Sequence, residues 1–263
     1  MRAFGGGVGA TTAARSRRTR DRRVSVRDEL VSVVLPTYNE RENIGELIER
    51  TLASVRQPVE VNVVDDDSPD GTWQVVQAMA EREPRIRLLR RMNERGLTSA
   101  LMAGIGLAQG DVVAWMDCDP SMPPEVLPAL LAATGQADVV AGSRYVPGGR
   151  DDGRSLTGQL FSRTINLAAS LLLGWRIKDY TSGFLAVRRP VFDRIPLRGD
   201  YGEYCIDLLA RAQRLGFTVR EVPYRCAPRL RGESKTASNP IGYIKRGWKY
   251  VVTILRLRFD RSR

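Results

Sequence analysis

The 263-residue sequence contains no histidine. This absence excludes a histidine general base and a zinc site with histidine ligands. Cysteine is also scarce, because only Cys118, Cys205 and Cys226 occur and the sequence has no Cys-x-x-Cys pair. An odd number of widely separated cysteines argues against a disulfide framework and indicates a reducing compartment.

Long apolar runs are missing as well. A helix that spans a bilayer needs about 18 consecutive apolar residues, and the longest candidate, residues 165–175, is shorter and contains Asn166 and Ser170. Residues 1–28 lack the apolar core of a signal peptide. They are rich in Gly, Ala and Arg without periodicity, which predicts a disordered basic arm rather than an organelle transit peptide.

The charged residues are unevenly distributed along a chain whose formal net charge is +11. Residues 1–28 carry eight Arg against two Asp, and residues 241–263 carry seven Lys or Arg against one Asp, so each end is net +6. Between them, residues 29–149 have 10 basic and 18 acidic groups (−8), whereas residues 150–240 have 16 and 9 (+7). Two basic ends indicate attraction to an anionic membrane surface, with nucleic acid as the rival ligand.

Strand and helix patterns alternate from residue 31 onward. Short apolar runs typical of strands occupy residues 31–35, 59–64, 85–90, 112–116, 139–141, 181–187 and 219–224. Helical spacing of apolar residues falls at 44–55, 73–81, 98–108, 161–173 and 203–215. This alternation predicts one α/β domain, residues 29–240, with a mostly parallel, doubly wound sheet and helices on both faces.

Two carboxylates follow the apolar run that begins at Val112. Asp117 and Asp119 are spaced by two, so on an extended chain their side chains point the same way, and Pro120 ends the run. Ligands of open α/β sheets bind at the carboxyl ends of the strands. Paired oxygen ligands at such a place suit Mg²⁺ or Mn²⁺ carrying a diphosphate. The alternative is that both aspartates simply cap the next helix.

Polar loops follow two further strands. Residues 36–40 come after the first strand, and Asp65, Asp66 and Asp67 follow the second. Three adjacent aspartates persist only where helix amides, a metal or ligand hydroxyls offset their charge. We expect these loops and Asp117 to form one rim of the sheet. The dinucleotide-binding fingerprint is missing, because no Gly-x-Gly-x-x-Gly follows the first strand.

The C-terminal segment, residues 241–263, has the pattern of a basic amphipathic helix. Its apolar residues are spaced by three and four: Ile241, Ile244, Trp248, Val252, Leu255 and Phe259. Basic residues, among them Lys249 and Arg256, occupy another face. Such a helix either lies in a membrane interface or packs on its own domain or a partner helix, and the pattern leaves both alternatives open.

Taken together, the motifs resemble the family 2 inverting glycosyltransferases, and within them the dolichol-phosphate (polyprenol-phosphate) mannose synthases. The matching segments occur in the family's order over residues 31–236: 34–40, 63–72, 117–119, 142–145 and 232–235. The resemblance implies a GT-A fold and a nucleotide-diphosphate-sugar donor. It further implies metal-dependent transfer of a sugar, in the first place mannose from GDP-mannose, to a polyprenyl monophosphate with inversion.

The resemblance also implies roles for individual residues. Those that match its nucleotide-binding loops are Pro36, Tyr38, Glu40, Asp65, Asp66, Asp67 and Gly96. Its metal–diphosphate motif falls on Asp117 and Asp119. The positions with implied catalytic roles are Asp119, Arg144 and Arg163. The residues expected at the acceptor phosphate are Arg144, Arg163, Arg229 and Lys235.

The implied chemistry suits a chain without histidine. A phosphate monoester has a second pKa of about 6, so the lipid phosphate is already ionised at pH 7 and needs no protein base. It does need cations, because a dianion must be held beside the leaving diphosphate. The basic residues of the second half of the chain supply them.

The chain departs from the family pattern in two places. Ser121 stands where relatives often have glutamine, which is a better metal ligand, and residues 204–207 keep only the aromatic and acidic character of the usual motif. Many relatives also carry C-terminal transmembrane helices. Without one, we expect this chain to reach its lipid at the cytoplasmic face of a membrane, by surface contact or through a small membrane protein partner.

Two other functions remain open from the sequence. The same fold could transfer glucose or another sugar from a UDP or GDP donor, to lipid phosphate or to a hydroxyl acceptor, for which Asp207 or Glu203 would act as general base. A non-enzymatic alternative is an α/β protein that binds nucleic acid through its basic ends. That alternative leaves the acidic rim unexplained, and we therefore expect no nucleic-acid partner.

Overall fold

The structure, a computed structural model, describes residues 28–227 and 240–260, and within the second range the side chains from residue 247 onward. Apart from Asp28, the arm expected at residues 1–28 lies outside the described residues. The same holds for Arg229, Lys235 and the motif at 232–235.

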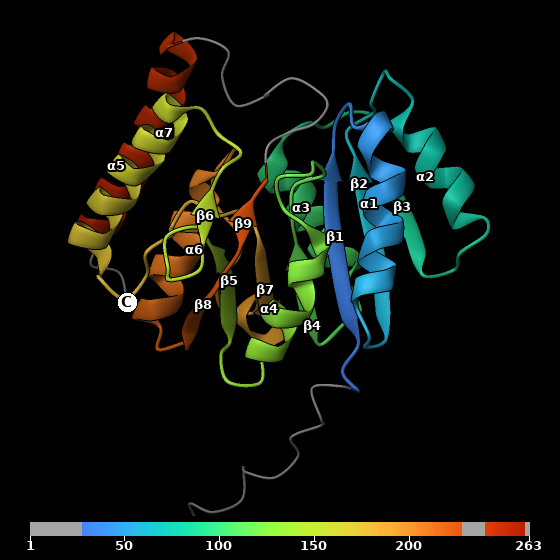
Figure 1. Ribbon diagram of the computed structural model, residues 1–263, viewed down its shortest axis with the longest axis horizontal. Helices are drawn as coiled ribbons and strands as arrows, with labels where there is room; N and C mark the ends of the chain where they lie inside the picture. The colour runs from blue at the N-terminus through green and yellow to red at the C-terminus, as the bar shows by residue number, and fades with distance from the viewer. Residues whose placement is uncertain (1–27, 228–239, 261–263) are drawn as a thin grey trace, which may run out of the picture.

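The centre of the domain is a seven-stranded sheet with the order β3-β2-β1-β4-β7-β5-β8 (Figure 1). Only β7 runs antiparallel to its neighbours, β4 and β5. The strands are β1 (Val31–Thr37), β2 (Val59–Asp65), β3 (Ile86–Arg90), β4 (Val112–Trp115), β5 (Val139–Ser143), β7 (Leu185–Arg188) and β8 (Val219–Pro223). The mostly parallel sheet predicted from the sequence is confirmed.

Within the described residues, seven α-helices cover the two faces of this sheet. They are α1 (Arg41–Ser54), α2 (Thr72–Ala80), α3 (Leu97–Leu107), α4 (Leu127–Ala133), α5 (Leu156–Leu173), α6 (Glu203–Arg214) and α7 (Pro240–Phe259). Alternation along β1 shows how the faces divide. Val33 and Leu35 belong to the hydrophobic cluster on the face covered by α1, α2 and α4, whereas Val34 belongs to the cluster on the face covered by α3, α5, α6 and α7.

Helix α3 lies directly on β1 and β2, as its small residues predict. A methyl group added at Gly104 would come within 2.3 Å of Val34 Cγ1 and 3.1 Å of Val64 Cγ2, so this position has no room for a side chain. Its first residue, Leu97, lines a cavity together with residues from the carboxyl ends of β1 and β4.

Several elements differ from the sequence prediction. Helix α4, the 3₁₀ turns η1 (Pro124–Val126) and η2 (Arg189–Val191), and the short parallel pair β6 (Arg150–Asp151) and β9 (Arg225–Cys226) were not expected. The strand expected from residue 181 begins only at Leu185. The reason is local: the backbone N–H of Thr181 donates to Asp179 Oδ1 at 3.2 Å, which makes a turn of that segment.

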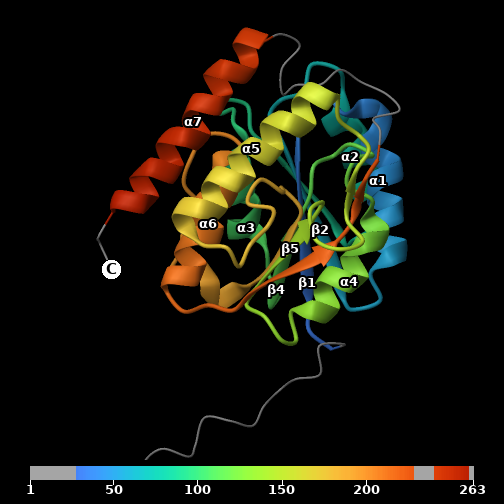
Figure 2. The ribbon, with the colours of Figure 1, turned by 60° about the vertical axis from the view of Figure 1, so that its left-hand side comes forward.

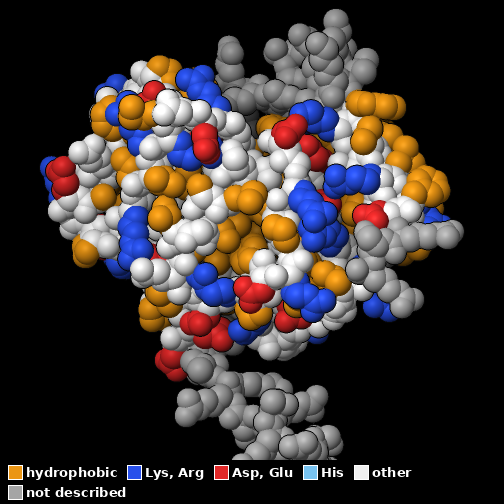
Figure 3. All heavy atoms as spheres, turned by 180° about the vertical axis from the view of Figure 1, so that it is seen from behind, with side chains coloured by type: hydrophobic (Ala, Val, Ile, Leu, Met, Phe, Trp, Pro, Cys, Tyr) orange, Lys and Arg blue, Asp and Glu red, His pale blue; other side chains and the backbone are white. Residues whose placement is uncertain are grey.

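Helix α7 packs beside α5 and α6, and α5 and α7 lie side by side in both views (Figures 1 and 2). Its inner face buries Gly247, Ile254 and Leu257. From residue 247 onward, the apolar stripe noted in the sequence lies on the outer face, with Trp248 66% and Phe259 75% exposed. In the view from behind, hydrophobic side chains gather along the edge where α7 lies (Figure 3). Over the described residues, no helix has the length and apolar character needed to cross a bilayer.

Candidate active site

The carboxyl ends of β1, β2 and β4 open into a first cavity of about 350 Å³. These strands are neighbours and parallel, so their last residues share one edge of the sheet. The cavity brings together seven residues that the sequence predicted for donor and metal binding: Pro36, Tyr38, Glu40, Asp66, Gly96, Asp117 and Asp119. The expected rim therefore exists as one concave surface.

Asp66 is the aspartate of the 65–67 run that lines this cavity. Its Oδ1 accepts hydrogen bonds from Arg91 Nε at 2.7 Å and Arg91 Nη2 at 2.5 Å, and both side chains are buried. Its Oδ2 accepts the backbone N–H of Gly96 at 2.8 Å. Arg91 also donates to the Gly96 carbonyl at 3.1 Å. Gly96 has a φ of +143°, a backbone conformation that favours glycine. The Asp66–Arg91 ion pair therefore fixes the turn at Gly96 beside the cavity.

The other two aspartates of the run have different positions. Asp65 is fully buried and accepts hydrogen bonds from Thr37 Oγ1 at 2.8 Å and Ser68 Oγ at 2.6 Å, which tie the β1 and β2 ends together. Asp67 pairs with Arg90 at 2.5 Å. Neither lines the first cavity. The charge of the run is thus offset mainly by two arginines at the end of β3, a compensation that the sequence prediction did not consider.

Asp117 and Asp119 both line the first cavity. Asp119 Oδ1 accepts the backbone N–H of Ser121 at 2.9 Å, which fixes the turn after β4. Among the described residues, no three His, Cys, Asp or Glu side chains form a group that could hold a metal ion. Two carboxylates beside an open cavity nevertheless fit Mg²⁺ or Mn²⁺, because such ions bind through one or two carboxylates together with substrate phosphates.

A second cavity, of about 370 Å³, meets the first at Leu97, Asp117 and Tyr201, which line both. Its polar wall includes Arg144 and Arg154. Its apolar wall comes mainly from α5, α6 and α7 and includes Phe161, Ile165, Tyr204 and Tyr250. One side of Asp117 therefore faces an acidic pocket, and the other faces a pocket that combines arginines with apolar and aromatic side chains.

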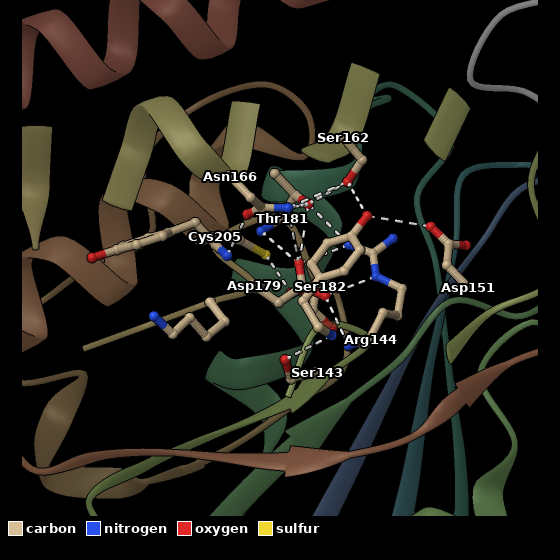
Figure 4. A network of polar contacts seen from close by, with 12 residues as sticks. Ser143, Arg144, Asp151, Ser162, Asn166, Asp179, Thr181, Ser182 and Cys205 are labelled. Atoms are coloured by element: carbon tan, nitrogen blue, oxygen red, sulfur yellow. Dashed lines mark hydrogen bonds and ion pairs between the residues drawn. The ribbon is translucent and has the colours of Figure 1, made fainter. Parts of the chain in front are cut away.

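Arg144 is buried at the centre of a polar network (Figure 4). Its Nε and Nη2 donate to Asp179 Oδ2 and Oδ1 at 2.8 and 2.7 Å, and Nη2 also donates to Thr181 Oγ1 at 2.9 Å. Burial alone would lower the pKa of the guanidinium, but the Asp179 carboxylate raises that pKa well above its usual value. Arg144 therefore keeps its charge, and Asp179 fixes its orientation toward the second cavity.

Arg163 is not brought to this place. It lies exposed on α5 and lines a third cavity, of about 490 Å³, which includes Arg144 but neither Asp117 nor Asp119. Asp207 and Glu203, the bases considered for a hydroxyl acceptor, are buried and line none of the three cavities. Asp207 instead pairs with Arg211 at 3.3 Å and Arg256 at 2.9 Å.

Asp179, Arg91 and Tyr201 are among the site residues that were missed in the sequence, as is Arg154. Asp179 precedes Thr181 in an Asp-x-Thr turn pattern, which is a usable signal for a buried carboxylate that accepts backbone N–H groups. Arg91 follows β3, and the neighbouring strand β2 ends at the aspartates 65–67. The pairing of Arg91 with Asp66 can be predicted only when the order of these strands is known. Tyr201 lies in an irregular loop, and no sequence pattern indicates it.

Comparison with known sequences identifies the family. The profile of glycosyl transferase family 2 matches residues 32–196, which is more than half of the chain. The chain belongs to this family. It is therefore a glycosyltransferase, and its mostly parallel sheet with helices on both faces is the GT-A fold that the sequence motifs implied.

Named relatives share a large part of this glycosyltransferase sequence. Polyprenol monophosphomannose synthase of Mycolicibacterium smegmatis is 40% identical over 88% of this chain and 89% of its own length. Undecaprenyl-phosphate mannosyltransferase of Micrococcus luteus is 37% identical over 81% and 89%. Dolichol-phosphate mannosyltransferase of Pyrococcus furiosus is 38% identical over 80% of this chain, which spans only 60% of that protein.

Solved structures show the same fold. Glucosyl-3-phosphoglycerate synthase of Mycobacterium tuberculosis, in complex with Mn²⁺, UDP-glucose and phosphoglyceric acid, superposes with a TM-score of 0.68 over 88% of this chain and 80% of its own. The sequences are 22% identical, so the likeness concerns the fold alone.

Proposed function

We propose that this glycosyltransferase transfers mannose from GDP-mannose to a polyprenyl or dolichyl monophosphate, with inversion at the anomeric carbon. The observation that carries the proposal is the junction at Asp117 of an acidic cavity and a cavity with arginine and apolar walls. The first suits a nucleotide sugar with its metal ion. The second suits a substrate that has a phosphate at one end and a hydrocarbon chain at the other. The names of the relatives support mannose as the sugar and a polyprenyl phosphate as the acceptor.

The donor is proposed to lie in the first cavity. Tyr38, beneath the guanidinium of Arg95 at 5.0 Å, offers an aromatic face to the nucleoside. Gly96, Pro36 and Glu40 bound the same space. In this proposal Asp65 and Asp67 contribute by shaping the loops, since their carboxylates lie outside the cavity.

Asp117 and Asp119 would hold Mg²⁺ or Mn²⁺, and the donor diphosphate would complete the coordination. Such an ion offsets the negative charge that develops on the leaving diphosphate. The Mn²⁺ seen with UDP-glucose in glucosyl-3-phosphoglycerate synthase supports a divalent ion. Asp119, held by the Ser121 amide, is preorganised for this role.

The acceptor phosphate is proposed to lie in the second cavity, where Arg144 and Arg154 counter its charge. One of its oxygens bonds to the anomeric carbon while the bond from that carbon to the diphosphate breaks and GDP leaves. The phosphate is already ionised, so no proton has to be removed by the protein. Phe161, Ile165 and Tyr250 would contact the first isoprene units. Arg229 and Lys235 remain proposed acceptor-phosphate ligands from the sequence alone.

The lipid is proposed to arrive from a membrane surface met by the outer faces of α5 and α7. These faces expose large apolar residues side by side, among them Leu160, Leu171, Trp248 and Phe259. Tyr250 and Phe161 of the same two helices line the second cavity, so this apolar surface adjoins it. Exposed Arg258 of α7 fits the phosphates of an anionic leaflet, whereas Lys249 and Arg256 already pair with Asp200 and Asp207. We further propose that this contact is made at the cytoplasmic face of the membrane, directly or through a small membrane protein partner.

One experiment tests the donor, the acceptor and the stereochemistry together. The protein is incubated with a panel of radiolabelled nucleotide sugars and a polyprenyl phosphate, with and without Mn²⁺. We expect label in the lipid from GDP-mannose, dependence on the divalent ion, and a β-linked product from the α-linked donor by NMR. Transfer from UDP-glucose alone, or an α-linked product, would refute the proposed donor or the inversion.

A further inference from the structure

The third cavity contains cations that the proposed reaction does not use. Arg163 and Lys178 are exposed on its wall, and within residues 28–227 and 240–260 no carboxylate forms an ion pair with either. Trp175 lies beside them, with Lys178 Nζ 5.9 Å from the centre of its ring. The buried guanidinium of Arg144 forms part of the inner wall.

Two carboxylates that bind the backbone or side chains of residues in this wall, Asp179 and Glu221, are already engaged in hydrogen bonds. Asp179 binds Arg144 in the two-pronged contact described above. Glu221 accepts the backbone N–H groups of Lys178 and Asp179, both at 2.8 Å, with its two oxygens. Neither Asp179 nor Glu221 forms an ion pair with Arg163 or Lys178, so both cations can bind an anion from outside the described residues.

The surroundings of Arg163 indicate where that anion comes from. Five exposed residues follow one face of α5 at helical spacing: Leu156, Leu160, Arg163, Leu167 and Leu171. If the leucines of this stripe enter a bilayer, the arginine between them can extend its aliphatic stem along the apolar surface. Its guanidinium then stays hydrated at the level of the lipid phosphates. Trp175 lies at the same cavity, and tryptophan is enriched at the interface between membrane and water.

We propose that the third cavity binds the phosphodiester headgroup of an anionic phospholipid, separate from the phosphate that accepts the sugar. The fork of Arg163 suits two oxygens of one phosphate, and Lys178 adds a point charge. This lipid anchors the end of α5 that is remote from the second cavity. The inference rests on the proposed function only in placing α5 at a membrane.

A soluble probe tests the site without a membrane, a donor or an acceptor. Dihexanoylphosphatidylglycerol below its micelle concentration is titrated into the protein, and tryptophan fluorescence is followed, with Trp175→Phe to identify the signal. We expect Lys178→Ala and Arg163→Ala each to weaken binding by about tenfold or more, as for the loss of a charge-assisted hydrogen bond. The matched control is Arg176→Ala, because Arg176 is exposed two residues from Lys178 but does not line the cavity. It should bind like the wild type.

Two further titrations separate the possible ligands. Dihexanoylphosphatidylcholine, which is zwitterionic, should bind far more weakly than the phosphatidylglycerol probe. Inorganic phosphate at equal concentration should not displace that probe; displacement would mean a site for free phosphate and would overturn the lipid assignment. If Arg176→Ala lost as much binding as Lys178→Ala, the probe would be attracted by the general positive charge of this surface. That result would overturn the proposed site.

The sugar-transfer assay decides whether the site is separate from the acceptor. With a short, water-soluble polyprenyl phosphate, Lys178→Ala should keep the KM and kcat of the wild type, because the third cavity contains neither Asp117 nor Asp119. A rise in KM for this acceptor of about fivefold or more, a loss of about 1 kcal/mol in binding, would assign the cavity to the acceptor and overturn the proposal. The fluorescence titration contains no donor, so failure of the transfer reaction would leave its result intact.

Discussion

Arg91 and Asp66 form a buried ion pair at the rim of the first cavity, with Arg91 Nε 2.7 Å from Asp66 Oδ1. The second oxygen of Asp66 accepts the amide of Gly96 at 2.8 Å, so one carboxylate connects the end of β2 to the turn before α3. This relationship gives an aspartate of the 65–67 run a role in shaping the first cavity, which is the proposed donor site.

Asp66→Asn should therefore weaken donor binding while the protein stays folded. The expected effect is a rise in the KM for the nucleotide sugar of about tenfold or more, because a hydrogen bond to a charged group contributes about 1.5–3 kcal/mol. Steady-state kinetics with varied donor measure it. Asp67→Asn is the comparison, since Asp67 pairs with half-exposed Arg90 and lies outside the cavity. An equal rise in KM for Asp67→Asn would show that its carboxylate contacts the donor after all.

Asp179→Asn should both destabilise the protein and impair use of the acceptor. Removing one partner of a buried ion pair costs about 3–5 kcal/mol in the free energy of unfolding, and Arg144 would lose the contact that orients it. Denaturant unfolding and the KM for lipid phosphate report the two effects. The double variant Arg144→Gln/Asp179→Asn should lose less stability than the two single changes added together, because it leaves no buried charge unpaired.

The same pair predicts a pH dependence of stability. Burial would raise the pKa of Asp179, but Arg144 lowers it below the usual value. The stabilisation is therefore complete above the usual aspartate pKa and is lost as the pH falls through the lowered value. In Asp179→Asn this acid-dependent loss should disappear from the unfolding free energy measured against pH. An unchanged pH profile would mean that the pair is not formed.

The outer face of α7 should bind lipid without contributing much to folding. Trp248→Ser combined with Phe259→Ser should abolish sedimentation with anionic liposomes and change the unfolding free energy by less than about 1 kcal/mol, as expected for two exposed sites. Ile254→Ser is the control, because Ile254 is buried and its loss should cost stability instead. Deleting the whole helix is a poorer test, since it also removes the buried Ile254 and Leu257. Normal liposome binding by the double variant would exclude this face as the membrane contact.

The three cysteines should be unreactive in the native protein. All are free and buried, and burial raises the pKa of Cys226 to about 11. A colorimetric thiol titration at pH 8 should find no fast-reacting thiol in the folded chain and three in denaturant. A fast-reacting thiol under native conditions would contradict the buried positions.

The sequence predicted the order of most strands and helices because burial on one or both faces leaves a strong periodicity. It also predicted which loops meet, since parallel strands end at one edge of the sheet. It could not predict how the charge of residues 65–67 is offset. Arg91 reaches Asp66 only because β3 pairs with β2, a contact between residues 25 positions apart.

Arg163 shows a second limit of sequence reasoning. A motif places a residue along the chain but not around the axis of a helix. On α5, Ser162 and Ile165 face the second cavity, whereas Arg163 points toward the third. Helix α7 shows the same limit, because an amphipathic pattern does not tell whether the apolar stripe packs on the domain or faces outward.

The most direct test of this account is transfer of labelled mannose from GDP-mannose to a polyprenyl monophosphate by the wild type and by Asp119→Ala. We predict that the wild type moves label into the organic phase only when Mg²⁺ or Mn²⁺ is present. Asp119→Ala, folded by circular dichroism, should be inactive because it lacks one of the two carboxylates that would hold the metal–diphosphate. Near-normal transfer by the folded Asp119→Ala variant would contradict the account.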